Sequence, residues 1–281
     1  MIFRFRISCT WCLSWFFVAV LPALATEPNP AQKLIRSAGV KIIAHRGNSS
    51  VAPENTLPAF KSAIAAGSDL VELDYHHSAD GVPVVIHDEI LDRTTNAEHL
   101  FGKAGLLVGD LTAARLQTLD AGRWFAEKFA GTKLPTLAQS LAVIQAGSVT
   151  LIERKGGDAA TLVKLLDEAK LTDQVVVQAF NWKFIIDCRQ LSPTLVLGTL
   201  SGKPPSDEQI DAAAATGADL IVWNHEKLGP AQIERIHGHG KKAWVYTVDQ
   251  PSRARALLAA GIDGIITNRP AEIIRVRSAS K

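Results

Sequence analysis

The strongest constraint on the fold of this sequence is a regular alternation of short apolar runs with longer segments of helical pattern. This order predicts a parallel sheet, because neighbouring parallel strands are joined by a crossover that is usually a helix. The strand candidates are residues 40–44, 70–74, 82–87, 149–153, 175–180, 194–197, 219–223, 242–248 and 263–267. The helical segments between them include residues 55–66, 136–146, 159–169, 207–216, 231–238 and 251–260.

Eight strand–helix units would close into a TIM-type (β/α)8 barrel, and we place this domain at residues 40–275. A chain of 281 residues, 47% of them hydrophobic, can bury the core of one such domain. The ninth strand candidate is explained if Asp80 and Gly81 form a two-residue hairpin turn, which would place Asp74 opposite His87. Residues 82–87 would then be a ribbon strand outside the barrel. Alternatively, residues 82–87 form a barrel strand and residues 219–223 lie outside the barrel. The sequence does not decide between these two arrangements.

Residues 88–135 interrupt the alternation with loop residues, a short helical piece and several aromatic side chains. A connection of this length is usually functional or a small subdomain. We therefore expect an inserted cap subdomain over one end of the barrel.

The first 25 residues have the pattern of a signal peptide. Arg4 and Arg6 precede a mostly apolar stretch, and Ala23-Leu24-Ala25 offers a cleavage site before Thr26. The alternative is an uncleaved anchor, but the apolar run is shorter than the roughly 20 residues that a spanning helix needs. We expect an exported protein, periplasmic or secreted, with no stable membrane insertion after cleavage. Residues 26–39 are expected to be a lead-in linker.

Charge and cysteine content narrow the possible partners. Removal of residues 1–25 would leave 28 basic residues against 28 acidic ones, which gives no basic footprint for nucleic acid. Only Cys188 would remain of the three cysteines, so an intramolecular disulfide is excluded in the mature chain. Neither the charge nor the cysteine content of the sequence indicates the oligomeric state.

Acidic side chains gather at the ends of two predicted strands. Glu72 and Asp74 end the second strand, and Glu153 ends the 149–153 strand. Side chains at i and i+2 point the same way, and the carboxyl ends of barrel strands carry the active site. Three converging carboxylates need a cation, and an all-oxygen set suits Ca²⁺ or Mg²⁺.

Basic residues and histidines follow the same strand ends. Arg46 and Lys155 offer fixed positive charge to the oxygens of an anion such as a phosphate. His45 ends the first strand and His87 lies across the turn from Asp74. Two histidines can accept and donate the protons that hydrolysis of a phosphodiester requires. Each residue alone could be structural, and it is their combination that favours an active site.

These residues lie in motifs that resemble the glycerophosphodiester phosphodiesterase family, within the phospholipase C-like phosphodiesterase barrels. The resemblance covers roughly residues 40–272. The matching motifs are Ala44-His45-Arg46-Gly47, Pro53-Glu54-Asn55-Thr56, Val71-Glu72-Leu73-Asp74, the 80–88 segment that ends in His87-Asp88, Leu91-Asp92-Arg93-Thr94-Thr95, Leu151-Ile152-Glu153-Arg154-Lys155 and the closing 261–270 segment.

The resemblance implies a function for each matched position. Glu72, Asp74 and Glu153 would hold a divalent cation, His45 and His87 would be the acid–base pair, and Arg46 and Lys155 would contact phosphate. The substrate would be a small glycerophosphodiester, cleaved to glycerol 3-phosphate and an alcohol. We assign His45 as the base and His87 as the acid.

The sequence departs from the family pattern at two places in the expected substrate pocket. It has Gln178-Ala179-Phe180 where the family often has Ser before Phe, and Tyr246-Thr247-Val248-Asp249 where the family often has Trp-Thr-Val-Asn. Tyr246 and Trp244 are therefore candidate substrate-binding residues, and the preferred alcohol stays open. The alternatives are a sphingomyelinase D-like enzyme acting on intact or lyso-phospholipids, and a non-catalytic barrel that binds phosphate or lipid.

Overall fold

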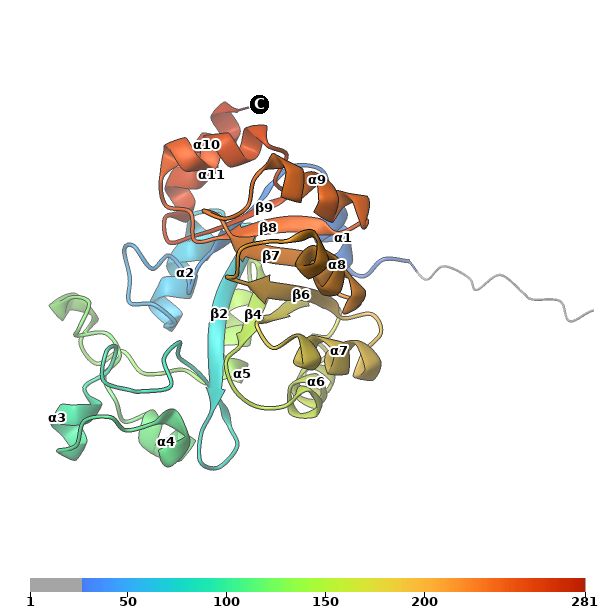
Figure 1. Cartoon of the computed structure of the whole chain (residues 1–281). Helices are drawn as coiled ribbons and strands as arrows, with labels where there is room; N and C mark the ends of the chain where they lie inside the picture. Colours follow the sequence, from blue (N-terminus) through green and yellow to red (C-terminus); the bar gives the residue numbers. More distant parts are fainter. Residues whose placement is uncertain (1–26, 281) are drawn as a thin grey trace, which may run out of the picture.

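The computed structural model describes residues 27–280, which form a closed barrel of eight parallel strands surrounded by helices (Figure 1). Pairing of the first strand with the second closes the barrel, so the predicted TIM-type (β/α)8 fold is confirmed. In barrel order the strands are β1 (Lys41–Ala44), β2 (Leu70–His77), β4 (Val149–Arg154), β5 (Val175–Ala179), β6 (Val196–Ser201), β7 (Leu220–Asn224), β8 (Lys242–Tyr246) and β9 (Gly264–Thr267). Residues 219–223 are not peripheral, because β7 lies between β6 and β8.

Each barrel strand alternates between an inward and an outward face. On β5, Val176 joins the apolar cluster inside the barrel, whereas Val175 and Val177 pack against the helices outside. Leu70, Leu151 and the neighbouring interior residues fill the barrel below the carboxylates. The interior is therefore a packed apolar floor, and Glu72, Asp74 and Glu153 lie above it toward the carboxyl ends of the strands.

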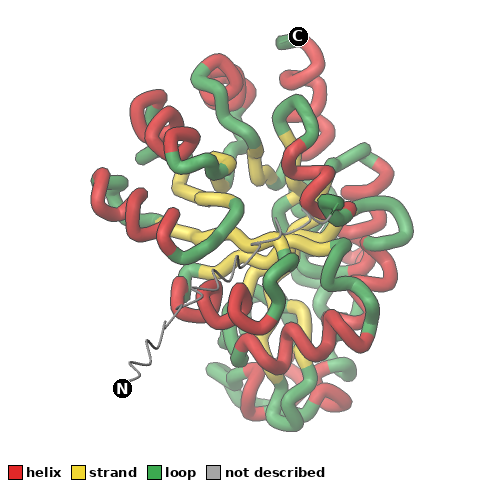
Figure 2. The backbone as a smooth tube through the Cα atoms, turned by 90° about the vertical axis from the view of Figure 1, so that its right-hand side faces the viewer, coloured by secondary structure: helices red, strands yellow, loops and turns green. Residues whose placement is uncertain are grey.

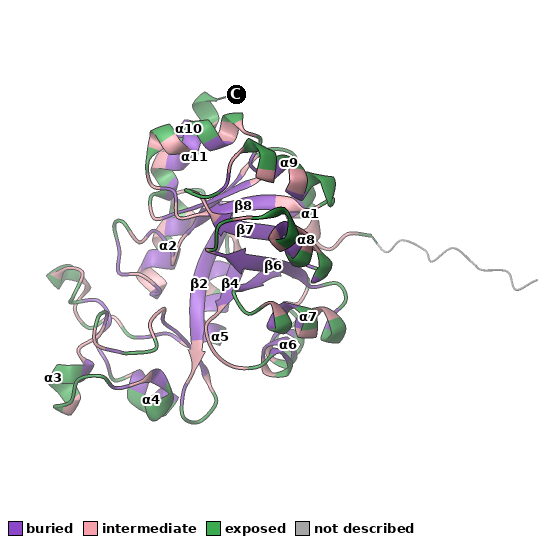
Figure 3. Ribbon diagram, in the orientation of Figure 1, coloured by how far each residue is buried: buried purple, intermediate pink, exposed green. Residues whose placement is uncertain are grey.

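The outer helices cover the strands, which are buried on both faces (Figures 2 and 3). They are α2 (Leu57–Ala65), α5 (Leu137–Ile144), α6 (Ala159–Glu168), α7 (Trp182–Leu191), α8 (Asp207–Ala215), α9 (Pro230–Gly238), α10 (Pro251–Ala259) and α11 (Pro270–Ala279). Several start at a capping side chain, as Thr136, Asp158, Asn181 and Ser206 each accept a hydrogen bond from the third helical N–H.

The lead-in segment differs from the linker that we expected. It contains helix α1 (Pro30–Arg36), which Asn29 starts with a capping box. Ala31 and Ile35 are buried and join the interior cluster of the barrel. Helix α1 therefore closes the amino-terminal end of the barrel, because these two small and branched side chains cover an apolar floor that would otherwise face water. The predicted signal peptide lies outside the described residues.

The ninth strand, β3 (Pro83–Val85), pairs antiparallel with the outer half of β2 and stands outside the barrel, as the ribbon hypothesis predicted. Its register is one residue off our prediction. Tyr75 pairs with Val85, and the Ile86 N–H donates to the Asp74 carbonyl, so Asp74 does not face His87 in the ladder. The reason is a three-residue loop in which Gly81 takes a left-handed φ of 76°.

The insertion after β3 is a small unit with its own apolar cluster. It contains α3 (Ala97–Phe101), α4 (Ala113–Leu116) and the short 3₁₀ turns η1 (Val108–Asp110) and η2 (Glu127–Phe129). Leu91, Leu116 and Leu119 are fully buried within this cluster. Figure 1 shows α3 and α4 beside the β2–β3 ribbon, so the unit flanks the barrel rather than lying over its whole end. Its two ends meet, because Val84 bridges to Thr136 and the Val85 N–H donates to the Pro135 carbonyl at 2.9 Å.

Candidate active site

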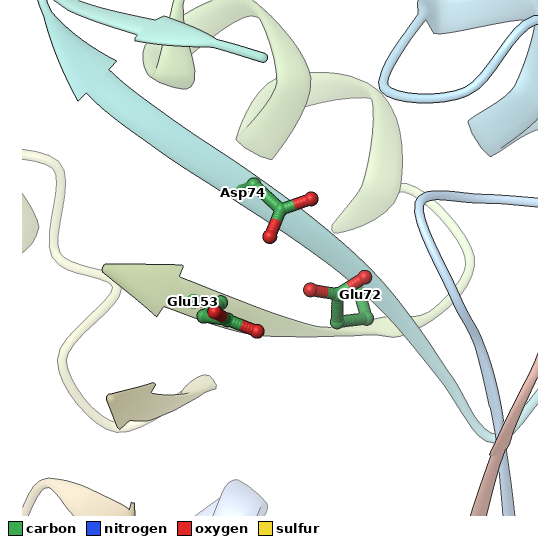
Figure 4. A group of neighbouring side chains, drawn as sticks. All are labelled: Glu72, Asp74 and Glu153. Atoms are coloured by element: carbon green, nitrogen blue, oxygen red, sulfur yellow. The ribbon is translucent and has the colours of Figure 1, made fainter. Parts of the chain in front are cut away.

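Three carboxylates meet inside the barrel at the carboxyl ends of β2 and β4 (Figure 4). Glu72 and Asp74 come from β2 and Glu153 from β4, where Asp74 and Glu153 are direct register partners. Each offers an oxygen, and these oxygens lie within 4.8 Å of one another. Their exposed fractions are 0%, 0% and 6%, so the predicted cluster is formed and withdrawn from solvent.

The electrostatics of this cluster fit a bound cation. Burial, together with the charge of Asp74, raises the pKa of Glu72 well above its usual range and that of Glu153 to about 7. Glu72 Oε1 and Asp74 Oδ1 are buried without a hydrogen bond in the described part of the chain. Buried carboxylate oxygens without donors are costly, and a divalent cation between them would remove that cost.

Gln178 adds a fourth oxygen that we did not predict as a ligand. It is the register partner of Glu153 on β5, its side chain points into the barrel, and it is 1% exposed. Its Oε1 atom is buried and also has no hydrogen-bond partner among the described residues. The sequence signal for it is weak, because an amide in an apolar strand shows neither its partner nor its direction.

Arg46 and Lys155, which we predicted to contact phosphate, both touch the carboxylate cluster. Lys155 Nζ lies 3.3 Å from Asp74 Oδ1 and also contacts Glu153, and Arg46 Nε lies 3.3 Å from Asp74 Oδ2. These two cations hold the pKa of Asp74 below its usual value, although burial acts in the opposite direction. The Arg46 backbone N–H donates to Glu72 Oε2 at 2.7 Å. This site therefore combines buried acids with fixed cations at its edge.

The turn after β1 depends on a glycine. Gly47 has a φ of 85°, and a Cβ atom there would lie 2.7 Å from the backbone of Ala59 in α2. Only glycine fits such a close approach. The chain can therefore turn sharply enough to present both His45 and Arg46 to the site.

Two residues of the Pro53–Thr56 motif, which precedes α2, bind side chains of the site. The Asn55 amide donates to Asp74 Oδ2 at 2.8 Å and accepts from the Asp74 backbone N–H at 3.1 Å. Glu54 pairs with Arg46 at 2.8 Å and accepts two further bonds from Arg93 of the insertion. The motif thus fixes Asp74 and Arg46 together.

His87 lies at the edge of the insertion with a carboxylate beside it. Its Nδ1 is 2.6 Å from Asp88 Oδ1, and Arg93 donates to the other oxygen of Asp88. The hydrogen bond from Arg93 holds the pKa of Asp88 far below its usual range. Burial lowers the pKa of His87, while Asp74 and Asp88 oppose that shift. The net effect is a lowered pKa of His87, which the two carboxylates moderate but do not reverse.

His45 has a different neighbour. Its Nδ1 lies 2.7 Å from the side-chain oxygen of Asn268, which follows β9. Burial, with Arg46 adding to it, lowers the pKa of His45 to about 4. His45 is consequently neutral near pH 7, and its Nδ1 faces an amide oxygen rather than the carboxylate that lies beside His87.

Of the two aromatic candidates, only Tyr246 borders the site. Burial and the charge of Glu153 raise the pKa of its hydroxyl to about 12, and the hydroxyl donates to the Ser201 carbonyl at 3.0 Å. Phe180, half-exposed, meets the Tyr246 ring edge-on at 6.0 Å. Trp244 is fully buried in the interior cluster, over Gly264, whose missing Cβ makes room for the indole. Our prediction that Trp244 binds substrate is therefore not supported; it belongs to the floor of the barrel.

Comparison with known proteins gives the same architecture and motifs. The sequence profile of the glycerophosphoryl diester phosphodiesterase family matches residues 45–272. A glycerophosphodiester phosphodiesterase of Caldanaerobacter subterraneus subsp. tengcongensis is 35% identical over 242 residues, which cover 84% of this chain and 96% of that protein. One from Bacillus subtilis is 30% identical over 289 residues, covering 94% and 95%.

A solved structure matches over the same region. A phosphodiesterase of Oleispira antarctica, in complex with the product sn-glycerol-3-phosphate, superposes with a TM-score of 0.78 at 28% identity and covers 85% of this chain and 96% of that one. The matched profile spans His45, all three acids and Lys155. On these grounds the chain belongs to the glycerophosphoryl diester phosphodiesterase family.

Proposed function

We infer that the protein hydrolyses glycerophosphodiesters to glycerol 3-phosphate and an alcohol. The observation that carries this inference is the meeting of three buried carboxylates, two cationic side chains and two histidines at one end of a barrel whose family has this activity. A non-catalytic phosphate-binding barrel would not need both histidines in addition to the charged groups.

The cation would be held by Glu72, Asp74 and Glu153, with the Gln178 amide oxygen as a neutral fourth ligand. All four donors are oxygens, which favours Ca²⁺ or Mg²⁺ over zinc. When bound, the cation neutralises phosphate oxygens and stabilises the charge that develops during displacement. Arg46 and Lys155 would bind the remaining phosphate oxygens from the edge of the cluster.

We propose that His45 accepts a proton from the nucleophile and that His87 protonates the departing alkoxide. His45 is neutral and carries an amide neighbour, so its free nitrogen can take up a proton. The anionic phosphate would raise the proton affinity of His45 when substrate is bound. His87 lies beside the Asp88 carboxylate, which stabilises the proton that it would donate. The nucleophile is water or the substrate's own glycerol hydroxyl.

A product assay tests the proposed activity. We expect glycerol 3-phosphate and the free alcohol from glycerophosphocholine or glycerophosphoethanolamine. The same assay on lysophospholipid distinguishes the sphingomyelinase D-like alternative, because release of choline from that substrate alone would replace our inference. Absence of turnover on all three substrates with added Ca²⁺ or Mg²⁺ would favour a binding protein.

We further propose that the protein is exported and that its mature form begins near Thr26. Removal of residues 1–25 would leave only a few residues before Asn29, which caps α1. In the described part of the chain no helix is both long and apolar enough to cross a membrane. N-terminal sequencing of protein recovered from the periplasm or medium should begin near Thr26, and an intact Met1 on membrane-bound protein would point to an anchor.

A further inference from the structure

His45 is held by a chain of side chains that begins at Asp249 in the segment after β8. Asp249 Oδ1 accepts hydrogen bonds from the Asn268 backbone N–H at 2.8 Å and from the Thr267 hydroxyl at 3.0 Å. Its other oxygen accepts from the Asn268 side-chain amide at 2.7 Å. Two segments that follow neighbouring barrel strands are thereby fastened together beside His45.

These bonds determine which way the Asn268 amide faces. A carboxylate only accepts hydrogen bonds, so the NH₂ group of Asn268 must point at Asp249. The amide oxygen then points at His45, with Nδ1 at 2.7 Å and the Ser49 hydroxyl at 2.9 Å. The reverse orientation would set the amide oxygen against the carboxylate of Asp249 and lose a charge-assisted bond.

The orientation of the amide in turn selects the tautomer of His45. An amide oxygen cannot donate, so Nδ1 must carry the proton. In the neutral imidazole Nε2 then has the free lone pair, and no described side chain occupies it with a hydrogen bond. A histidine in this state is prepared to accept a proton at Nε2.

We propose that Asp249 and Asn268 are positioning residues that lock His45 in the Nδ1–H tautomer, with Nε2 available as the proton acceptor of the reaction. This inference rests on the proposed role of His45 as the base. It also gives a function to Asp249, one of the two places where this sequence departs from the family pattern. The carboxylate acts on His45 through the amide and so orients it without placing a negative charge directly against the ring.

The test combines histidine NMR with kinetics. Long-range ¹H–¹⁵N spectra of the full chain distinguish the two tautomers, and the His45 signals are assigned by their loss in His45→Gln. The native protein should show the Nδ1–H tautomer at neutral pH. In Asp249→Asn the amide of Asn268 is free to turn over, so we expect a mixture of tautomers and a roughly ten-fold lower kcat, the effect of about one orienting hydrogen bond.

An exchange of the two side chains makes the test specific. In the Asp249→Asn/Asn268→Asp double variant, the new amide can still donate to the new carboxylate, which accepts from His45 Nδ1. The single tautomer should return and kcat should recover. The adjacent negative charge should raise the pKa of His45, so the acid limb of the kcat/KM profile should move to higher pH by about one unit. The shift reports that the new carboxylate lies against His45, whereas the return of the single tautomer and of kcat would not be expected of a merely structural pair.

Asp263→Asn is the matched control. Asp263 also accepts a backbone N–H, from Ala243 at 2.9 Å, and pairs with Lys242, but it lies at the opposite end of the barrel. It should leave the His45 tautomer and the pH profile unchanged. The proposal is overturned if Asp249→Asn keeps a pure Nδ1–H tautomer, or if the folded double variant does not recover the single tautomer. If the tautomer depends on Asp249 but His45→Gln remains fully active, then Asp249 and Asn268 do position His45, and it is the proposed role of His45 as the base that fails.

Discussion

Replacing His45 or His87 by alanine should lower kcat by about 10²- to 10⁴-fold on a natural glycerophosphodiester, the usual contribution of a general acid or base. Neither side chain is part of an apolar cluster, so both variants should keep the native fold. Steady-state kinetics with circular dichroism as the folding control measures this. His99→Ala, an exposed histidine on α3, should keep the native rate.

The choice of substrate then separates the two roles. A nitrophenyl ester of glycerol phosphate has a good leaving group and needs little protonation. His87→Ala should therefore regain most of its activity on this substrate, whereas His45→Ala should not. Rescue of His45→Ala alone would reverse our assignment of acid and base. Native rates for both variants on the natural substrate would show that neither histidine takes part.

Removal of the divalent cation should abolish activity, and Ca²⁺ or Mg²⁺ should restore it. The reason is the cluster of Glu72, Asp74 and Glu153, in which Glu72 Oε1 and Asp74 Oδ1 are buried without a hydrogen bond among the described residues, although Arg46 and Lys155 offset part of the negative charge. Calorimetric titration of chelator-treated protein with each ion measures the affinity separately from catalysis. Full activity after verified removal of metal would contradict the proposed site.

Substitution of each proposed ligand should show how much that side chain contributes to the affinity for the cation. Glu72→Gln, Asp74→Asn and Glu153→Gln each remove a charged ligand and should weaken binding by roughly 100-fold or more, beyond the effect of about 10- to 100-fold typical of outer-shell partners. Gln178→Leu removes a neutral oxygen and should cost roughly ten-fold. Glu168→Gln, an exposed acid on α6, should bind the ion normally. Unchanged affinity in Gln178→Leu would exclude it from the coordination sphere.

The barrel could be predicted from sequence because each strand is short, apolar and separated from the next by a helical segment. The prediction was less complete where local pattern is weak. Helix α7 is rich in aromatic and β-branched residues, which lower helical propensity, and α1 is too short to show a period. The burial of Ala31 and Ile35 in α1 depends on the finished barrel, which no local signal reveals.

The charged residues of the site could be predicted from their positions at the ends of strands, since a parallel barrel brings the carboxyl ends of its strands together. His45 was found in the same way, but the ligand role of Gln178 and the contact of Asn268 with His45 were not. His45 and Asn268 are separated by 223 positions in the sequence, and their contact depends on β1 lying next to β9. The hairpin register was wrong because the turn uses three residues, and Gly81 in either turn type gives the same sequence signal.

The attachment of the insertion has an evolutionary consequence. The residues that flank it are held side by side by the Val84–Thr136 bridge, and its apolar cluster is largely its own. A segment with adjoining ends and a separate core can be lengthened, shortened or exchanged without changing the strands that carry the acids. It reaches the reaction centre mainly through His87, Asp88 and Arg93. Given the proposed role of His87 as the acid, recombination that preserves these three side chains can diversify the surroundings of the departing alcohol while the chemistry at the strand ends stays intact.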